Sequence, residues 1–287
     1  MSTIFLSIII EALPFVLLGC LASGFLHVFL SAEIVQKIIP RNRVLAVLIG
    51  SVMGLFFPSC ECGIVPIVHR FMQKRVPRYT AFPFMLSAPI INPVVIFSTY
   101  IAFGRVWKFV ILRVLGSVLT SIVVGFWIAF WYRERMEDSE ETSLERNPVC
   151  KEHSFSGGKK IWFALEHSVD EFFDTGRFLM IGSLAAASMQ TWLPTKFVTQ
   201  MVDIKAVTIV ILLLLAFTLS LCSEADAFIG SSLLSMFGVG PIVAFLIFGP
   251  MVDIKNLLMM VRYFEGKFII KMVGLISLIV FLYSMLV

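Results

Sequence analysis

The chain has 287 residues, of which 59% are hydrophobic and 15% are charged, with a formal net charge of +4. A globular domain carries about a quarter charged residues, and no soluble core could enclose this much apolar surface. The composition excludes a soluble domain and predicts an all-α polytopic membrane protein. The positive charge lies in short loops, which sets orientation in the lipid bilayer and gives no indication of nucleic-acid binding.

The first apolar segment runs from Met1 to about Leu30. Its first residues lack the basic start of a signal peptide, so we expect a retained helix and no cleavage. Within this segment, Glu11 is followed by Pro14 and is a candidate proton site. We expect residues 1–132 to form a first transmembrane repeat.

Val44–Phe57 is a shorter apolar segment. As a helix it would measure roughly 21 Å, which is less than the ~30 Å of the hydrocarbon core. Basic residues flank it on both sides, so the positive-inside rule places both loops in the cytoplasm and predicts a re-entrant hairpin. These flanking residues are Lys37, Arg41, Arg43, Arg70, Lys74, Arg75 and Arg78.

The hairpin is followed by the motif Phe57-Pro58-Ser59-Cys60-Glu61-Cys62-Gly63-Ile64-Val65-Pro66. Pro58, Gly63 and Pro66 each disfavour a continuous helix, so we expect the backbone to break here. Broken backbone is tolerated at membrane depth only where protein buries it or where it lines a wet cavity. Such breaks are typical of transport sites.

The polar side chains of this motif admit two interpretations each. Glu61 is an ion ligand, a proton carrier or the partner of a cation, because a carboxylate inside the membrane costs a few kcal/mol; the alternative is a hydrated carboxylate at the interface. Cys60 and Cys62 beside it offer a soft ligand set for Zn(II), Cu(I) or a trivalent metalloid. Alternatively, the cysteines are small residues that allow close helix packing.

A second break is predicted at Ser87-Ala88-Pro89-Ile90-Ile91-Asn92-Pro93. Pro89 belongs to the expected transport pathway, and Asn92 either coordinates a substrate or holds the broken helix ends. The long apolar stretch Val106–Trp131 then completes the first half.

A polar stretch at residues 133–160 reads as a cytoplasmic linker, and residues 161–287 are expected to form a second transmembrane repeat. The landmarks recur there in the same order: Cys222 to Asp226 takes the place of the first motif, and Pro250 to Asp253 takes the place of the second. This order favours a duplication over chance similarity of two apolar sequences. Because the corresponding loops carry little basic charge, we expect two tandem inverted repeats with broken or re-entrant helices.

The second half adds its own candidate residues. Cys222, Glu224 and Asp226 form a second potential metal-ligand set, and together with the first motif they could close one site. Pro250 and Asp253 mark the second break. Like Asn92, Asp253 either coordinates a substrate or holds the broken helix ends; alternatively, it only pairs with Lys255. Glu171 and Asp174 are further proton candidates.

These motifs resemble the ArsP-like family of predicted bacterial permeases, which carry Pro-x-Cys-x-Cys-x-x-x-Pro and a later Ala-Pro-x-x-Asn segment. The matching residues are Pro58, Cys60, Cys62 and Pro66, followed by Ala88-Pro89-Ile90-Ile91-Asn92. With Glu61 between the cysteines and Glu224 near Cys222, the chain looks most like the YcgR-type branch. The resemblance implies a soft solute, thiol contacts, a multi-pass protein of the bacterial cytoplasmic membrane, and a second membrane protein encoded nearby as partner. Glu61 departs from the small residue usual between the cysteines of arsenical carriers, which argues against an organoarsenical and leaves room for a cationic metal.

Two functions follow. The first is a permease, a secondary transporter moving a soft metal, metalloid or thiol-reactive compound, with proton or metal-ion coupling and no cofactor. The alternative is a non-transporting subunit that anchors or regulates a partner membrane protein. An enzyme is not expected, since the sequence shows no nucleophile and base arrangement, and it contains no Gly-x-x-x-x-Gly-Lys-Ser/Thr loop for ATP hydrolysis.

Overall fold

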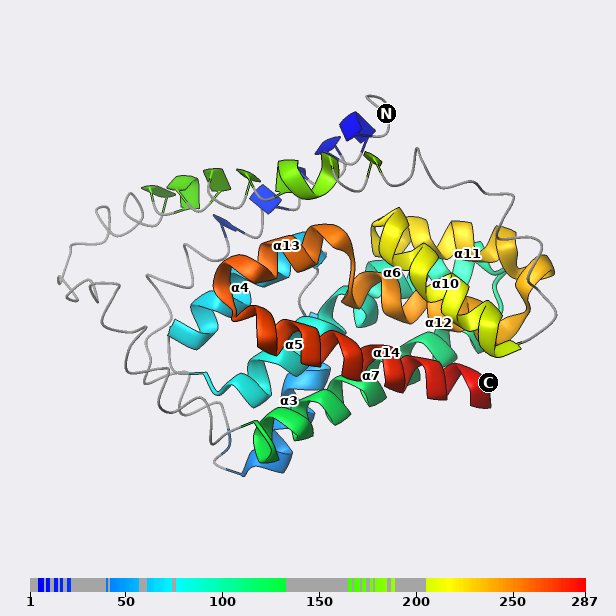
Figure 1. The fold of residues 1–287 in the computed structure, drawn as a ribbon, viewed down its shortest axis with the longest axis horizontal. Helices are drawn as coiled ribbons and strands as arrows, with labels where there is room; N and C mark the ends of the chain where they lie inside the picture. Colours follow the sequence, from blue (N-terminus) through cyan, green and yellow to red (C-terminus); the bar gives the residue numbers. More distant parts are fainter. Residues whose placement is uncertain are drawn as a thin grey trace.

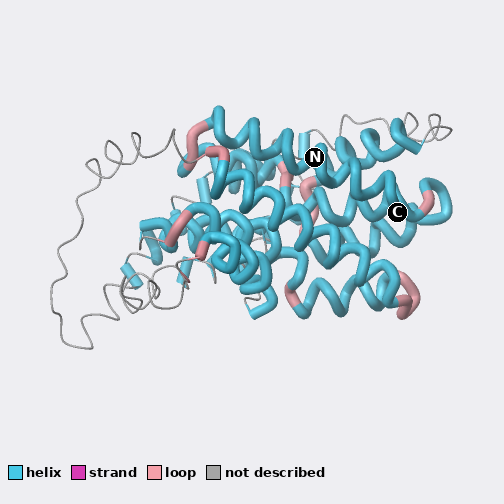
Figure 2. Tube along the Cα trace, turned by 90° about the horizontal axis from the view of Figure 1, so that it is seen from below, coloured by secondary structure: helices cyan, strands magenta, loops and turns pink. Residues whose placement is uncertain are grey.

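A computed structural model describes residues 42–56, 61–73, 76–132 and 205–287, together with Pro40 and scattered residues of 5–21 and 165–188. Every regular element in these ranges is helical (Figures 1 and 2). Four helical segments are long and apolar enough to cross a membrane: Arg78–Ala102, Trp107–Phe130, Val239–Val261 and Gly266–Leu286. The chain is thus a multi-pass membrane protein, as predicted. The linker at 133–160 and the residues Glu11, Glu171 and Asp174 lie outside the described part.

The first half begins with α3 (Arg43–Met53) and a short 3-10 helix, η1 (Gly54–Phe56). The side chain of Asn42 caps α3 by accepting a hydrogen bond from the backbone N–H of Val44. At 11 residues, α3 is about 17 Å long and too short to span the hydrocarbon core. The short apolar segment predicted there is confirmed.

Three prolines expected to mark breaks lie inside helices. Pro66 lies in α4 (Glu61–Gln73), Pro89 in α5 (Arg78–Ile91) and Pro250 in α12 (Val239–Met251). A helix tolerates a proline at the cost of one backbone hydrogen bond when neighbouring protein supports it. η1 ends at Phe56 and α4 begins at Glu61, so one helix ends and another begins at the predicted motif, although Gly63 and Pro66 lie inside α4. Pro58 lies outside the described residues.

The breaks near Pro89 and Pro250 are confirmed, a few residues further along the chain. Asn92 ends α5 and caps α6 (Pro93–Ala102) with an extended backbone, ψ 134°. Val252 ends α12, and Asp253 caps α13 (Ile254–Tyr263). Each long segment thus consists of two helices joined at a capped interruption.

The remaining helices complete two similar groups. α7 (Trp107–Phe130) follows α6, and α14 (Gly266–Leu286) follows α13. α10 (Lys205–Leu219) and α11 (Ser223–Phe237) precede α12. α3, α4 and α7 pack around α5, whereas α10, α11 and α14 pack around α12.

The two groups also contact each other. α5 packs against α12, α6 packs against α11, and α13 packs against α4. Residues Thr80–Ile91 of α5 and Gly240–Met251 of α12 are all buried, so these two helices form the centre. Val16, Cys20 and Leu179 belong to the same core. The interruption after α12 is consequently buried on both sides, whereas after α5 Asn92 is buried and Val94 of α6 is 54% exposed.

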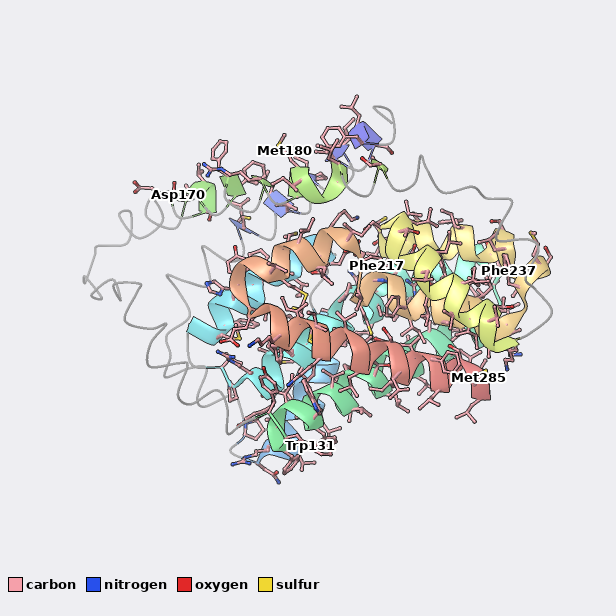
Figure 3. All side chains as sticks on the ribbon, viewed as in Figure 1. Trp131, Asp170, Met180, Phe217, Phe237 and Met285 are labelled. Atoms are coloured by element: carbon pink, nitrogen blue, oxygen red, sulfur yellow. The ribbon has the colours of Figure 1, made fainter. Side chains whose placement is uncertain are left out.

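The outer surface is apolar. Trp131 and Met285, labelled in Figure 3, are exposed at the periphery, as are Phe130, Ile270 and Leu286. Large exposed apolar side chains over most of a surface are expected where the solvent is lipid.

Candidate functional site

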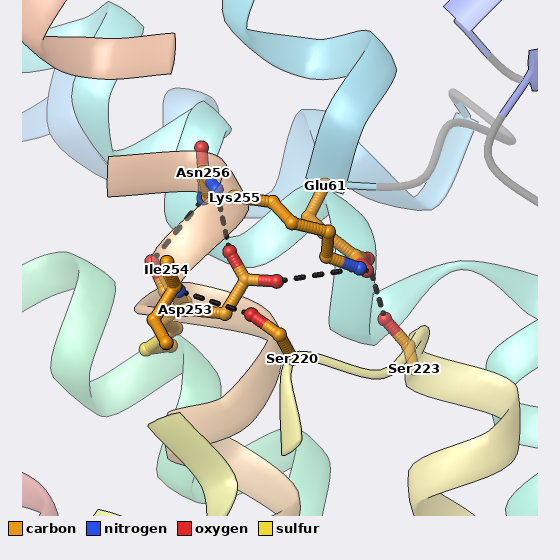
Figure 4. A network of polar contacts seen from close by, with 8 residues as sticks. Glu61, Ser220, Ser223, Asp253, Ile254, Lys255 and Asn256 are labelled. Carbon is orange, nitrogen blue, oxygen red and sulfur yellow. Dashed lines mark hydrogen bonds and ion pairs between the residues drawn. The ribbon is translucent and has the colours of Figure 1, made fainter. Parts of the chain in front are cut away.

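Glu61 is the first residue of α4, and its side chain is only 1% exposed. One carboxylate oxygen, Oε2, accepts a hydrogen bond of 3.2 Å from the hydroxyl of Ser223. The other, Oε1, lies 4.0 Å from the ammonium of Lys255 (Figure 4). Glu61 is therefore no hydrated interface residue, and its two contacts both come from the second half of the chain.

Asp253 organises the interruption between α12 and α13. Its Oδ1 accepts a 2.6 Å hydrogen bond from the backbone N–H of Asn256, which caps α13. Its Oδ2 lies 3.5 Å from the Lys255 ammonium. Asp253 therefore both holds the start of α13 and pairs with Lys255. Its coordination of a substrate stays a prediction.

Ser220 supports the same interruption from the loop between α10 and α11. Its hydroxyl accepts a 3.1 Å hydrogen bond from the backbone N–H of Ile254 (Figure 4). Ser220 has φ 50°, a left-handed conformation that is uncommon for a residue other than glycine. Ser220 adopts this conformation where its hydroxyl binds the first residue of α13.

The corresponding interruption in the first half, between α5 and α6, is capped by an uncharged side chain. The Asn92 side chain accepts a 2.9 Å hydrogen bond from the backbone N–H of Val94 and caps α6. Asn92 is thus seen to hold the broken ends. The two interruptions share a capping role, but only the second contributes charge.

Arg113, a buried cation on α7, was not singled out from the sequence. It is 1% exposed and donates three hydrogen bonds, to the carbonyl oxygens of Leu246 and Ser223 at 3.1 and 3.0 Å and to the Thr99 hydroxyl at 2.7 Å. These partners belong to α12, α11 and α6. Arg113 thus ties four helices together, and an arginine inside the apolar run Val106–Trp131 was the signal available for finding it.

Asp226 faces the close contact between α11 and α12. It is 2% exposed, and its Oδ2 has no hydrogen-bond partner among the described residues. A Cβ atom added to Gly249 would lie 2.7 Å from this oxygen. Glycine at 249 therefore makes room for the buried carboxylate.

The structure locates the cysteines only in part. Cys222 occupies the N-cap position of α11 and is half-buried, and Glu224 in the first turn of the same helix is also half-buried. Cys60 lies outside the described residues, and Cys62 belongs to the first turn of α4. Within the described residues, no three His, Cys, Asp or Glu side chains are grouped to hold a metal. The expectation of a metal site over both motifs stays a prediction.

The hydrogen bond from Ser223 to Glu61 nevertheless joins the two cysteine-bearing segments. Glu61 lies between Cys60 and Cys62 in the sequence, and Ser223 follows Cys222. Around this contact lie Lys255, Asp253, Asp226 and Arg113, all buried. Buried charges beside interrupted helices in a membrane protein are typical of ion and substrate pathways.

Such an arrangement of interrupted membrane helices is typical of one class, the multi-pass membrane permeases. The whole chain, residues 1–287, matches the family ArsP_1, described as "Predicted permease", and the protein belongs to that family.

Two relatives match over nearly their full length. A Streptococcus mutans protein named "Putative two-component membrane permease complex subunit" is 53% identical over 99% of this chain and 93% of its own length. The UPF0718 protein YcgR of Bacillus subtilis is 43% identical over 100% of this chain and 96% of its own length. No solved structure matches the chain.

Proposed function

We propose that the protein is a secondary transporter whose substrate path passes the contact between Glu61 and Ser223, and that it moves a soft metal, metalloid or thiol-reactive solute. The observation that supports this is the 3.2 Å hydrogen bond between these residues, which joins the two cysteine-bearing segments inside the protein. Thiolates beside a carboxylate are ligands suited to soft cations. We propose that transport by this protein involves neither catalysis nor a resident cofactor.

The packing of the helices also suits alternating access between two related halves. α6, which follows the interruption after α5, contacts α11 of the second half, and α13, which follows the interruption after α12, contacts α4 of the first half. The helix after each interruption therefore packs against the other half of the chain. We interpret the halves as inverted repeats, in which rocking of one against the other would expose the interruptions alternately to each side.

A transport assay tests the proposal directly. Full-length protein is reconstituted in liposomes, and uptake of Zn²⁺, Cd²⁺, Cu⁺, arsenite and methylarsenite is measured beside a Cys60→Ser, Cys62→Ser double variant. We expect accumulation of one of these solutes that the double variant abolishes. A Cys20→Ser variant is the matched control, because Cys20 is buried in the core and lies outside both motifs. Equal transport by the wild type and the double variant would refute a thiol-dependent path.

A second candidate, a subunit that works only with a partner membrane protein, is favoured by the name of the Streptococcus mutans relative. We infer that this chain too has such a partner. Co-purification with the membrane protein encoded beside it, followed by reconstitution with and without that protein, separates the two functions. Transport by the isolated chain supports a self-sufficient carrier, and transport only by the complex supports the subunit.

A further inference from the structure

Lys255 is a cation buried between carboxylates of the two halves. Its side chain is 4% exposed, and its ammonium lies 3.5 Å from Asp253 Oδ2 and 4.0 Å from Glu61 Oε1 (Figure 4). A close ion pair between an ammonium and a carboxylate measures about 2.7–2.9 Å. Lys255 therefore lies within ion-pair distance of both carboxylates, but farther from each than the length of a direct charge-assisted hydrogen bond.

The buried charged side chains around Lys255 have a negative sum of charges, which attracts a cation to the position of its ammonium. Among the fully buried side chains of the described residues, three are acidic, namely Glu61, Asp226 and Asp253, and two are basic, namely Arg113 and Lys255. Arg113 donates its hydrogen bonds to carbonyl and hydroxyl oxygens and not to a carboxylate. Asp226 Oδ2 has no partner in the same part of the chain. The formal charge of these five residues is negative even with Lys255 in place.

We propose that Lys255 is a tethered competitor of a cationic substrate, whose ammonium occupies the position between Glu61 and Asp253 that a soft divalent metal ion takes during transport. This inference rests on the proposed function and narrows its substrate class. A divalent ion balances two carboxylates, and Cys222, the residue before the Ser223 that binds Glu61, offers a thiol that favours a soft metal. A neutral metalloid carries no charge with which to displace an ammonium.

The side chain and its place in the fold suit this role. Lysine carries its charge on a flexible four-carbon stem, and Lys255 is the second residue of α13, directly after the interruption at Val252 and Asp253. When the metal leaves, the ammonium can return and compensate the carboxylates. The empty carrier then changes conformation without an unpaired buried charge, which would cost several kcal/mol.

The test measures binding of Cd²⁺ and Zn²⁺ to the purified full-length protein in detergent by titration calorimetry. A Lys255→Met variant keeps the length of the side chain and removes its charge. We expect its Kd for Cd²⁺ to fall by at least about tenfold, because a unit charge 4 Å away no longer competes. We also expect its Tm to be low without metal and to rise more with Cd²⁺ than the Tm of the wild type.

Two further variants keep the result decisive if Lys255→Met folds poorly. Lys255→Arg keeps the charge and should bind Cd²⁺ with nearly wild-type affinity. A Glu61→Gln, Lys255→Met double variant removes one acid and one base together and should fold without any gain in affinity. A gain in the double variant as large as in Lys255→Met would contradict competition for these carboxylates.

The outcomes separate this inference from the function on which it rests. If the wild type neither binds nor transports a metal while it moves a neutral arsenical, the tethered-competitor role fails and the transporter survives. If the wild type moves no solute at all, the proposed function itself fails. If the wild type binds Cd²⁺ and Lys255→Met binds it no more tightly, the role of Lys255 alone is overturned.

Discussion

At the scale of single residues, Arg113 supports the site by hydrogen bonding. It contacts Leu246, Ser223 and Thr99 at distances of 2.7–3.1 Å. Arg113→Met removes the cation and leaves buried carbonyl and hydroxyl groups unpaired. We expect a loss of about 3 kcal/mol or more in stability, because hydrogen bonds to a charged group contribute about 1.5–3 kcal/mol each.

The measurement is the Tm of the detergent-purified protein together with its abundance in the membrane. Arg113→Lys should recover part of the stability, since it keeps the charge but cannot present the three-directional donor geometry of a guanidinium. Unchanged Tm and abundance for Arg113→Met would show that these hydrogen bonds are dispensable.

Ser223 offers a milder change at the centre of the candidate site. Ser223→Ala removes the 3.2 Å hydrogen bond to Glu61 and leaves the charge of Glu61 unchanged. We expect a loss of about 1 kcal/mol in stability and a raised KM for the transported solute, because the carboxylate loses an orienting contact. Ser231→Ala, on the same helix with an exposed hydroxyl, is the control. Identical transport kinetics in both variants would place Glu61 outside the path.

Much of this site could be found from sequence by looking for polar residues in apolar segments. Glu61, Asn92 and Asp253 were identified in that way, and the pairing of Asp253 with Lys255 was anticipated as one alternative. The convergence of Glu61 with Ser223, 162 positions apart, was not predictable, because apolar periodicity gives no information on which helix packs against which. Arg113 was overlooked because its neighbours make Val106–Trp131 read as uniformly apolar.

At the scale of helices, the sequence predicted where the interruptions lie, but the prediction attributed them to the prolines and not to the residues that cap the next helix. Pro89 and Pro250 lie inside α5 and α12, and these helices end only at Asn92 and Val252. Proline weakens a helix by removing one donor, whereas a capping side chain defines where the next helix begins. The capping residue is therefore the better marker of the interruption than the proline before it.

Close packing of η1 against α5 depends on Gly54. A Cβ atom at this position would clash with the backbone of Ala88, which cannot move aside as a side chain can. Gly54→Ala should therefore destabilise the protein by about 3 kcal/mol, at the upper end of the cost of overpacking. Thermal unfolding of the purified variant measures the effect.

Gly274 supplies the matched control in α14. Nothing lies within 4 Å of a Cβ added there, so Gly274→Ala should be neutral or stabilising by up to about 1 kcal/mol through helix propensity. Equal loss of stability in both variants would indicate a general intolerance of alanine and not a specific helix contact.

At the scale of the whole molecule, the two groups of helices have the same order and related packing. A short apolar helix, α3 or α10, packs against a central helix, α5 or α12, whose continuation reaches the other group. Two groups in the same orientation could also pack in this way. The distribution of basic residues in the loops is what favours opposite orientations.

Opposite orientation makes a testable prediction about which side each loop occupies. In a variant with all five cysteines replaced by serine, we introduce Asn42→Cys before α3 or Met236→Cys near the end of α11; both positions are exposed. Inverted repeats place position 42 in the cytoplasm and position 236 outside. A membrane-impermeant maleimide should therefore label intact cells carrying Met236→Cys, and should label Asn42→Cys only after permeabilisation. Labelling of both positions from the same side would mean that the halves are parallel, and alternating access would then need a different rotation between them.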